Sequence, residues 1–462
     1  MNDNLEVIIL AAGLGTRMKS ATIKILHQAA GRPIIDYVLD LAGDLCPTPP
    51  VMVIGYQREA VQKSVGNRAR YAVQEQQLGT GHAVLQAATL LENGDLAGRR
   101  ILILSGDVPL TRRETLEALL AQHDREGNAL TLLSMKLPEP AMYGRIVRDE
   151  SGAVVRIVEA KDASDEQKRI DEVNAGIYVF NAEHLFDNLR NLSPENAQKE
   201  YYLTDLIAVL REAGHRVGAV VAADPVEMLG VNSRGELAQV ESEIQRRVVQ
   251  RLMAEGVTFR NPATVVIDST VSIGQDTVVY PFVTLEGTTR IGEGCVIEPG
   301  VHLVNVTVGD DVHLKTGTVA EDAIVEDEAA VGPYAHLRPG TQLGRRVKVG
   351  NFVETKKAVF GEGAKASHLS YIGDAEVGAD VNIGAGTITC NYDGVNKHKT
   401  ILEDGVFVGS DTQLVAPVRV GRGAYVGAGS TITKDVPAEA LALSRTAQRN
   451  IEGWAARKKA KH

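Results

Sequence analysis

Residues 271–303, VSIGQDTVVYPFVTLEGTTRIGEGCVIEPGVHL, carry an aliphatic residue at every sixth position. A fixed six-residue period is the signature of a parallel β-helix, because each short strand stacks its aliphatic side chain on that of the next coil. The second half of the chain is therefore predicted to be a β-helix of hexapeptide repeats. The residues in phase are Ile273, Val279, Leu285, Ile291, Ile297 and Leu303.

The repeats extend from about residue 262 to about residue 440. Val325, Val331, Leu337, Leu343 and Val349 keep the same spacing, whereas segments near 354–370 and 388–402 interrupt it. In a solenoid, departures from the repeat map to loops that project from one side, often where ligands bind. Both interruptions are therefore predicted to form projecting loops.

The first half of the chain has a different pattern. Short apolar runs at 7–10, 51–54 and 101–104 alternate with helical stretches, which predicts a mostly parallel sheet covered by helices on both faces. In such sheets, ligands bind at the carboxyl ends of the strands. An amphipathic stretch at 233–255 begins with a capping box, Ser233 and Glu236, and ends at Gly256, so it is predicted to be a connecting helix.

These patterns divide the chain into an amino-terminal domain at 1–232, the connecting helix at 233–255, a repeat domain at 256–445 and a basic tail at 446–462. A length of 462 residues favours two or three domains. The net charge of −10 argues against a nucleic-acid binder. Three scattered cysteines, the absence of a signal-peptide pattern and the absence of a long apolar run predict a cytoplasmic protein without a membrane segment.

The first apolar run leads into residues 10–18, LAAGLGTRM. Gly13 and Gly15 allow backbone N–H groups to close on a phosphate, and Arg17 and Lys24 add positive charge there. A Gly-x-Gly pair alone is weak support. The dinucleotide fingerprint is excluded because Met18 stands in place of its third glycine, and no Gly-Lys-Ser/Thr completes a Walker loop.

Asp107 follows the third apolar run, within the sequence Gly106-Asp107-Val108-Pro109. A carboxylate leaving a buried strand is placed to bind Mg²⁺, which prefers oxygen ligands and substrate phosphates. Equally, Asp107 could cap the next helix.

In the repeat domain, His368 has the intrinsic pKa that a general base needs near neutral pH, and Glu354 could orient it. Arg338 and Lys356 supply positive charge suited to a phosphate group. The alternatives are a structural histidine and ordinary surface cations.

Together, residues 10–18, Gln77-Leu78-Gly79-Thr80 and 106–109 resemble the sugar-nucleotide pyrophosphorylases. With the hexapeptide repeats, nearly the whole chain resembles the bacterial bifunctional N-acetylglucosamine-1-phosphate uridyltransferase / glucosamine-1-phosphate acetyltransferase family. That resemblance implies Mg²⁺ ligation by Asp107 and Asn232, and stabilisation of the α-phosphate by Arg17 and Lys24. It implies nucleotide and sugar binding by Leu10, Ala11, Gly13, Lys24, Gln74, Gln77, Gly79, Thr80, Tyr143, Gly144, Arg145, Glu159, Asn174 and Asn232. The alternative for Asn232 is a second helix cap.

For the repeat domain, the resemblance implies that His368 is the general base. It implies binding of glucosamine 1-phosphate by Arg338, Lys356, Tyr371 and Asn382, and of acetyl-CoA by Ala385, Asn391, Tyr392, Ser410, Ala428 and Arg445. It further implies a left-handed β-helix and a homotrimer that shares its acetyl-transfer sites. The chain departs from the family at one point, where Ile23 replaces the usual proline before Lys24.

The predicted activity is therefore acetylation of glucosamine 1-phosphate by acetyl-CoA, followed by uridylyl transfer from UTP to N-acetylglucosamine 1-phosphate, with release of pyrophosphate. The product would feed bacterial cell-wall precursor synthesis. One rival is a single-activity nucleotidyltransferase whose β-helix is only structural. A second is a non-catalytic scaffold, although Arg17, Lys24 and Asp107 are all retained.

Overall fold

The computed structural model describes residues 4–13, 15–92, 96–140 and 142–459. The chain forms two compact units, residues 1–244 and 245–462, and the division falls within helix α7 (Arg234–Ala254). The domain limits predicted from the sequence, at residues 232, 255 and 445, remain predictions.

The first unit is built around one large mixed sheet in the order β11-β7-β10-β6-β1-β4-β5, with β8 and β9 attached to it through β10. Its strands are β1 Leu5–Leu10, β4 Val51–Ile54, β5 Arg70–Val73, β6 Arg100–Ser105, β7 Leu130–Lys136, β8 Arg145–Arg148, β9 Val154–Val158, β10 Glu172–Asn181 and β11 Val217–Val221; β2 Gln28–Ala29 and β3 Arg32–Pro33 form a separate pair. Its helices are α1 Ile34–Leu45, α2 Arg58–Val65, α3 Thr80–Leu91, α4 Arg113–Glu126, α5 Ala182–Leu189 and α6 Leu206–Glu212.

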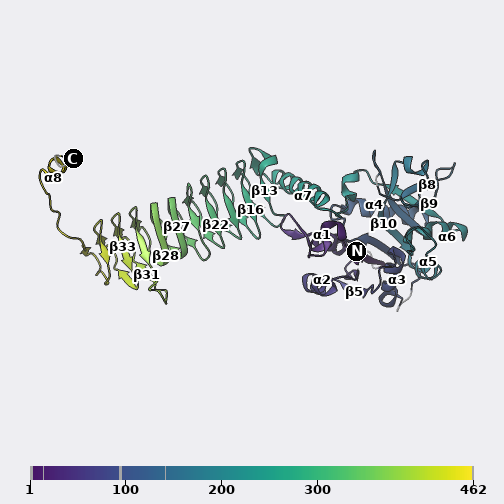
Figure 1. Cartoon of the computed structure of the whole chain (residues 1–462), viewed down its shortest axis with the longest axis horizontal. Coiled ribbons are helices and arrows are strands. Elements are labelled where there is room, and N and C mark those ends of the chain that lie inside the picture. Colours follow the sequence, from purple (N-terminus) through teal and green to yellow (C-terminus); the bar gives the residue numbers. More distant parts are fainter. Residues whose placement is uncertain (1–3, 14, 93–95, 141, 460–462) are drawn as a thin grey trace. The chain divides into compact units, whose positions relative to one another are not determined.

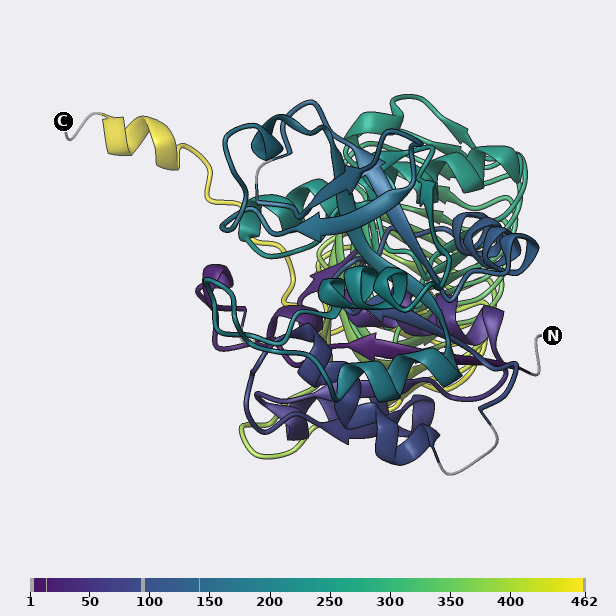
Figure 2. The ribbon, with the colours of Figure 1, turned by 90° about the vertical axis from the view of Figure 1, so that its right-hand side faces the viewer.

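Helices cover both faces of this sheet (Figure 1 and Figure 2). On one face, Val7 and Ile9 of β1 belong to the core that includes residues of α1, α2 and α4. On the other face, Ile8 belongs to the core that includes residues of α3, α5 and α6. Alternate residues of a strand point to opposite faces, so a continuous apolar run is what a strand between two helical layers requires. The predicted sheet with helices on both faces is confirmed, although β10 runs antiparallel to β6, β7 and β8, and β8 runs antiparallel to β9.

Strand β1 lies between β4 and β6 and is parallel to both. The chain after β1 proceeds to β4 and β5 on one side, and β6 joins on the other side, so the strand order reverses at β1. The loops that leave β1 and β6 therefore diverge and open a crevice at the carboxyl ends of these strands. The predicted phosphate loop and Asp107 follow these two strands.

Helix α7 begins with the predicted capping box. The Ser233 hydroxyl donates to Glu236 Oε2 at 2.9 Å, and the Glu236 backbone N–H donates back to that hydroxyl at 3.3 Å. The same carboxylate accepts from the backbone N–H of Asn232 at 2.9 Å, so the reciprocal cap satisfies amides at the start of the helix. Gly256, with φ of +99°, follows the end of the helix as predicted.

The second unit is a parallel β-helix, left-handed as the resemblance implies (Figure 1). It has three strands per coil, because most strands pair with the third strand after them. Ile273 lies opposite Ile291, and Leu285 lies opposite Leu303. The in-phase residues of 271–303 are at most 5% exposed, so the six-residue period marks the interior column as predicted.

Most strands of the β-helix have two or three residues. They are β12 Thr258–Phe259, β13 Val266–Ile267, β14 Ser272–Ile273, β15 Val278–Val279, β16 Thr284–Glu286, β17 Arg290–Ile291, β18 Val296–Ile297, β19 His302–Val304, β20 Thr307–Val308, β21 His313–Leu314, β22 Val319–Glu321, β23 Ile324–Val325, β24 Ala330–Val331, β25 His336–Leu337, β26 Gln342–Leu343, β27 Lys348–Phe360, β28 Lys365–Val377, β29 Asn382–Ile383, β30 Ile388–Cys390, β31 Thr400–Leu402, β32 Phe407–Val408, β33 Gln413–Val415, β34 Val418–Val420, β35 Tyr425–Val426, β36 Thr431–Ile432 and β37 Leu441–Ala442.

One of the two predicted projecting loops is wrong. Residues 354–370 lie within or between the long strands β27 and β28, which pair at a constant offset of 17 residues, from Lys348 opposite Lys365 to Phe360 opposite Val377. The coil therefore continues there, although the sequence period weakens. The second interruption is real, because the offset grows from 17 residues, at Tyr371 opposite Ile388, to 25 residues, at Ala375 opposite Thr400. The extra residues form a loop between β30 and β31.

The predicted basic tail contains a short helix, α8 (Trp454–Lys459), and its described residues are exposed. Residues 460–462 of the tail lie outside the described part of the chain. Among the described residues, no helix combines the length and apolarity needed to cross a membrane.

Candidate active sites

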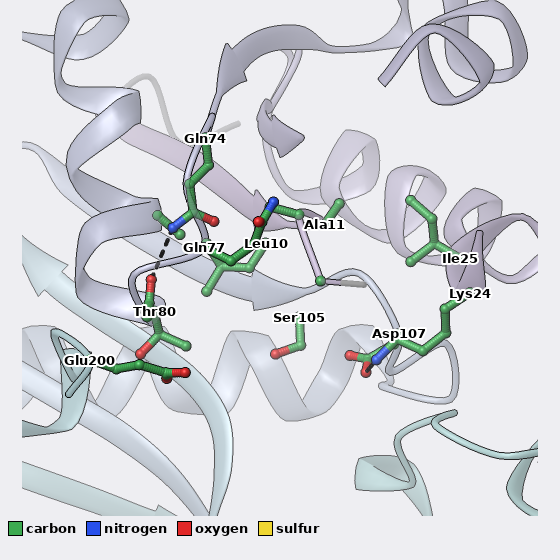
Figure 3. Close-up of a pocket in the computed structure, with 14 residues that line it drawn as sticks. Leu10, Ala11, Lys24, Ile25, Gln74, Gln77, Thr80, Ser105, Asp107 and Glu200 are labelled. Carbon is green, nitrogen blue, oxygen red and sulfur yellow. Dashed lines mark hydrogen bonds and ion pairs between the residues drawn. The ribbon is translucent and has the colours of Figure 1, made fainter. Parts of the chain in front are cut away.

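A cavity of about 280 Å³ opens at the carboxyl ends of β1 and β6 (Figure 3). Every residue predicted to bind the nucleotide base, ribose or phosphates lines it except Arg17: Leu10, Ala11, Gly13, Lys24, Gln74, Gln77, Gly79 and Thr80, together with Asp107. Ser105 and Glu200 also line it, and sequence reasoning missed both. Ser105 directly precedes Gly106-Asp107-Val108-Pro109, which was a signal for it, whereas no motif surrounds Glu200.

The Gln74 side chain is buried and held in one orientation. Its amide nitrogen donates to the Gly79 carbonyl at 3.1 Å and lies 3.0 Å from His82 Nδ1. The carbonyl partner requires the nitrogen on that side, which leaves Gln74 Oε1 as the acceptor toward the cavity (Figure 3). Gly79 is required because its φ is +106° and a Cβ would lie 2.6 Å from the Tyr201 carbonyl oxygen.

A second cavity of about 450 Å³ adjoins the first, because Ser105 and Asp107 line both. Its lining contains the remaining predicted residues of this unit except Arg145: Arg17, Tyr143, Gly144, Glu159, Asn174 and Asn232. Arg145 is buried, and its guanidinium donates to the Tyr143 carbonyl, which braces the loop that carries Tyr143 and Gly144. All the residues predicted for the sites of this unit except Arg145 therefore line one of two cavities, which share Asp107.

The polar groups of the second cavity are held by neighbours. Asn174 Nδ2 donates to the Tyr178 hydroxyl at 2.6 Å, and Asn174 Oδ1 accepts from the backbone N–H of Gly176 at 3.0 Å. Burial, followed by the negative charges of Asp162 and Asp205, raises the pKa of the Glu159 carboxyl. Such a carboxyl is a ready hydrogen-bond partner for sugar hydroxyl or amide groups.

Lys24 Nζ lies between the two predicted metal ligands. It forms an ion pair with the Asp107 carboxylate and donates to Asn232 Oδ1 at 2.9 Å. One carboxylate oxygen and one amide oxygen thus converge on a single cation. This is the kind of oxygen donor set that Mg²⁺ takes, with substrate phosphates and water completing its coordination. Gly15 allows this approach, since a Cβ there would lie 2.8 Å from Lys24 Cβ.

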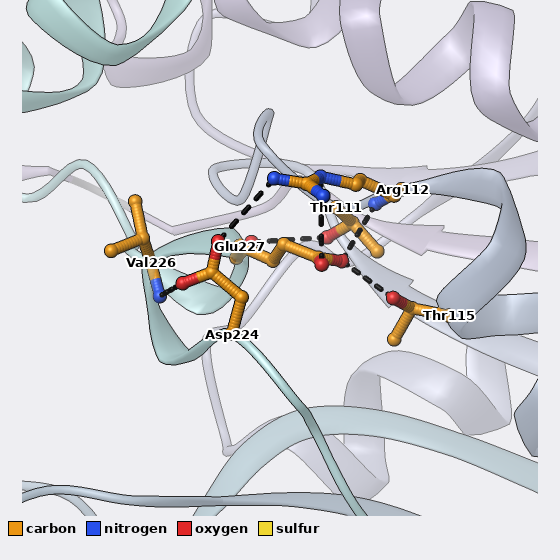
Figure 4. A network of polar contacts seen from close by, with 6 residues as sticks. All are labelled: Thr111, Arg112, Thr115, Asp224, Val226 and Glu227. Carbon is orange, nitrogen blue, oxygen red and sulfur yellow. Dashed lines mark hydrogen bonds and ion pairs between the residues drawn. The ribbon is translucent and has the colours of Figure 1, made fainter.

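The segment that carries Asn232 is fastened to the Asp107 loop. The backbone N–H of Val231 donates to the Asp107 carbonyl at 2.9 Å. Just before it, the short helix η6 (Pro225–Met228) is tied to the start of α4 through buried Glu227, which accepts from the Arg112 backbone N–H and the Thr115 hydroxyl (Figure 4). Two segments far apart in sequence therefore present their oxygens to one point.

The structure excludes the helix-capping alternatives for these two residues. The N-cap of α4 is Arg112, so Asp107 does not cap that helix. The side-chain oxygen that caps α7 belongs to Ser233, while the Asn232 side chain contacts Lys24. Both side chains are thus directed to the cavities.

In the β-helix, His368 lies on β28 and is exposed. Its Nδ1 lies 2.9 Å from Oδ1 of Asn351, its neighbour on the preceding coil. Because that oxygen can only accept, Nδ1 carries the proton in the neutral ring and Nε2 keeps a lone pair. The predicted orienting role of Glu354 is wrong, since Glu354 instead pairs with Arg338 at 2.8 Å.

Three cationic side chains, Arg338, Lys356 and Lys397, lie near one another in the β-helix. Glu354, the partner of Arg338, lies opposite Tyr371 on the next coil. The Lys397 ammonium lowers the pKa of Lys356, and burial and then the Arg338 guanidinium lower it further. Sequence reasoning missed Lys397, although the loop that carries it was predicted to project. Asn382, in β29, lies opposite Lys365 of β28.

Three of the residues predicted to bind acetyl-CoA, Ala385, Ser410 and Ala428, form a column. Ala366, Ile383, Val408 and Val426 are aligned on successive coils, so the residues two positions later, His368, Ala385, Ser410 and Ala428, are also aligned. Arg445 donates to the Ala428 carbonyl at 2.7 Å, at the far end of the column. Asn391 of the projecting loop donates to Asp374 of β28, and the Tyr392 hydroxyl donates to the Gly394 carbonyl within the loop, both at 2.5 Å.

Comparisons with known proteins agree with both halves of the chain. The nucleotidyl transferase family model matches residues 6–225, and the bacterial transferase hexapeptide model matches residues 270–305 and 399–434. A bifunctional protein GlmU of Pelobacter propionicus is 52% identical over 462 residues, covering 99% of this chain and 100% of the relative. The bifunctional protein GlmU of Geobacter sulfurreducens is 49% identical over 478 residues, covering 99% of each chain.

The similarity spans the amino-terminal sheet and the β-helix together, so the single-activity and scaffold alternatives are set aside. The chain belongs to the GlmU family of bifunctional enzymes, which carry a uridyltransferase and an acetyltransferase on one polypeptide.

Proposed function

We propose that the β-helix acetylates glucosamine 1-phosphate from acetyl-CoA, and that the amino-terminal cavities then join the product to UTP. The observation that carries the second step is the pair of cavities that share Asp107. A nucleoside triphosphate in the first cavity and a sugar phosphate in the second would bring their phosphates together at this point.

In uridylyl transfer, a phosphate oxygen of N-acetylglucosamine 1-phosphate attacks the α-phosphorus of UTP. The bond from that phosphorus to the bridging oxygen breaks, and pyrophosphate leaves. Arg17 and Lys24 neutralise the charge that otherwise repels the incoming phosphate. Mg²⁺, held by Asp107 and Asn232, would supply further charge neutralisation at the phosphates when bound. The convergence of both oxygens on Lys24 Nζ supports this ligand set.

Sugar recognition falls to the groups of the second cavity. The Glu159 carboxyl and the Asn174 amide face the space where the hexose and its N-acetyl group would lie, and Gly144 leaves room beside them. Hydrogen bonds or burial hold these side chains in place before the substrate binds. The sugar is therefore bound in one orientation, which directs its phosphate toward the nucleotide.

Base choice follows from Gln74. Its free Oε1 can accept from the N3–H of uracil, whereas cytosine has an unprotonated N3 that would repel it. With N-acetylglucosamine 1-phosphate and Mg²⁺, we expect UTP to react with a kcat/KM about a hundredfold or more above that of CTP, ATP or GTP, with dTTP between them. Pyrophosphate release from the parallel reactions measures this.

Alanine variants of two glutamines in the same loop test the role of Gln74 in base choice. Gln74→Ala should narrow the preference for UTP over CTP by about tenfold, while the exposed Gln76→Ala should leave it unchanged. Equal use of UTP and CTP by the unaltered protein would contradict the proposed role of Gln74.

In acetyl transfer, His368 Nε2 takes a proton from the amino group of glucosamine 1-phosphate as the nitrogen attacks the thioester carbonyl. The carbon–sulfur bond then breaks, and coenzyme A leaves as its thiolate. Asn351 holds the imidazole so that Nε2 is the basic atom, which supports this assignment. Arg338, Lys356 and Lys397 would bind the sugar phosphate, with Tyr371 and Asn382 contacting the sugar.

The column below His368 would receive the acetyl donor. Ala385, Ser410 and Ala428 have small side chains, so an extended pantetheine arm can lie along the coils and direct its thioester toward His368. Arg445 would meet the phosphates of coenzyme A, and Asn391 and Tyr392 would border the reacting end.

The proposed assembly is a homotrimer. Exposed apolar side chains adjoin His368. The rings of Tyr334 and Phe352 stack with their centroids 5.8 Å apart, and Leu369, which is 64% exposed, follows Phe352 on the next coil. A second copy of the chain covering this column would complete the acetyl-transfer site. The proposed location is the cytoplasm, where both nucleotide and acetyl-CoA substrates are available, and the proposed product supplies peptidoglycan and lipopolysaccharide synthesis.

A further inference from the structure

The loop before Lys24 is held by one side chain from another part of the sheet unit. Gln57 Oε1 accepts from the backbone N–H of Ile23 at 3.1 Å, and Gln57 Nε2 donates to the Ala21 carbonyl at 2.7 Å. The loop spans 20–23, and the short helix η2 (Lys24–Leu26) begins directly after it. The Gln57 carboxamide thus forms hydrogen bonds to the backbone on both sides of Thr22, which is exposed.

The backbone at Gln57 is unusual for this residue type. Its φ is +52°, in the left-handed region, at the N-cap position of α2, where its side chain makes no cap hydrogen bond. A side chain in this region costs about 1 kcal/mol relative to glycine. The carboxamide is directed instead to the Lys24 loop, so the strained position serves a contact made outside its own helix.

The contact acts at the point that fixes Lys24. Ile23 is buried and is the N-cap of η2, and its carbonyl accepts from the Leu26 backbone N–H at 3.0 Å. One residue later, Lys24 Nζ reaches Asp107 and Asn232. Restraining the Ile23 amide therefore restrains the start of the helix from which the lysine side chain projects.

We propose that Gln57 is a positioning residue for uridylyl transfer: it clamps residues 21–23 and thereby holds Lys24 at the phosphate junction. This inference rests on the proposed role of Lys24. It also explains how the chain accommodates Ile23, because a proline at this position would have no N–H to give to Gln57. The two hydrogen bonds of Gln57 thus supply the backbone restraint that a proline ring would give at this position.

The geometry supplies a rescue experiment. Ile23 has a φ of −60°, which is the value that a proline ring imposes. Ile23→Pro can therefore restrain the backbone without Gln57. If the clamp matters because it restrains this backbone, proline should restore what removal of the carboxamide takes away.

We expect Gln57→Ala to lower kcat for uridylyl transfer by about tenfold, with KM for UTP changed by less than about threefold, because Lys24 acts most strongly on charge that develops during phosphoryl transfer. The Gln57→Ala, Ile23→Pro double variant should recover to within about threefold of the unaltered protein. Rates are expressed per chain that binds UTP, with the binding stoichiometry taken from calorimetry, so that a misfolded fraction does not count as slow catalysis.

Two further variants separate the possible outcomes. Arg58→Ala changes the next residue, whose side chain pairs with Glu75, and should leave kcat unchanged. Lys24→Ala tests the function on which the inference rests. A slow Lys24→Ala variant beside a fully active Gln57→Ala variant would overturn the clamp alone, as would failure of proline to rescue. A fully active Lys24→Ala variant would instead overturn the proposed role of Lys24.

Discussion

His368→Ala is expected to lower acetyl transfer to glucosamine 1-phosphate by about 10²- to 10⁴-fold, the usual range for loss of a general base. The amine of the sugar must lose a proton as it attacks the thioester, and Nε2 of the Asn351-oriented ring is the atom available to take it. Coenzyme A thiol release measures the rate. Uridylyl transfer from supplied N-acetylglucosamine 1-phosphate should not change.

A second histidine of the same β-helix provides the control. His313 pairs with Glu298 at 2.6 Å and belongs to neither proposed site, so His313→Ala should retain acetyl transfer. An active His368→Ala protein would remove the histidine from the chemistry. If His368→Ala also stopped uridylyl transfer, the two sites would not be independent.

Asp107→Ala has the opposite expected effect: uridylyl transfer falls by about a hundredfold or more, and acetyl transfer is unchanged. The substitution removes the carboxylate of the proposed metal site and the ion-pair partner of Lys24 together. Pyrophosphate release over a series of Mg²⁺ concentrations measures both the rate and the metal requirement, which should shift to higher concentration.

Two further variants serve as controls for the Asp107→Ala experiment. Asp107→Asn keeps the size of the side chain and removes its charge, so it should also be slow even where Ala disturbs the loop. Asp124, which pairs with Arg100 in the same unit, is a matched acidic residue outside the cavities, and Asp124→Ala should be active. Undiminished, Mg²⁺-dependent nucleotide formation by both Asp107 variants would exclude Asp107 from the metal site.

Much of the fold and of the uridyltransferase cavities could be predicted because their signals are local. The six-residue period directly identifies the side chains that form the interior column of the β-helix. The apolar runs before Ala11 and Gly106 identify the two strands whose carboxyl ends lie together. Parallel neighbours bring their following loops to one edge, so Lys24 and Asp107 meet there although 83 positions separate them.

The parts that could not be predicted depend on register. The neighbour of His368 is the residue 17 positions earlier, Asn351, and not the acidic residue closer in sequence, Glu354. That offset is a property of the closed coil and is invisible where the aliphatic period weakens. For the same reason, the sequence does not show that residues 354–370 continue the coil. Nor does it show that the loop between β30 and β31 brings Lys397 near Lys356.

The central claim is that the crevice between β1 and β6 binds a nucleoside triphosphate through its backbone amides and cations. Isothermal titration of the full-length protein with UTP in the presence of Mg²⁺ tests it most directly. The account predicts saturable binding with about one site per chain, weakened about tenfold or more in Lys24→Ala. Absence of any UTP binding by the unaltered protein under these conditions would contradict it.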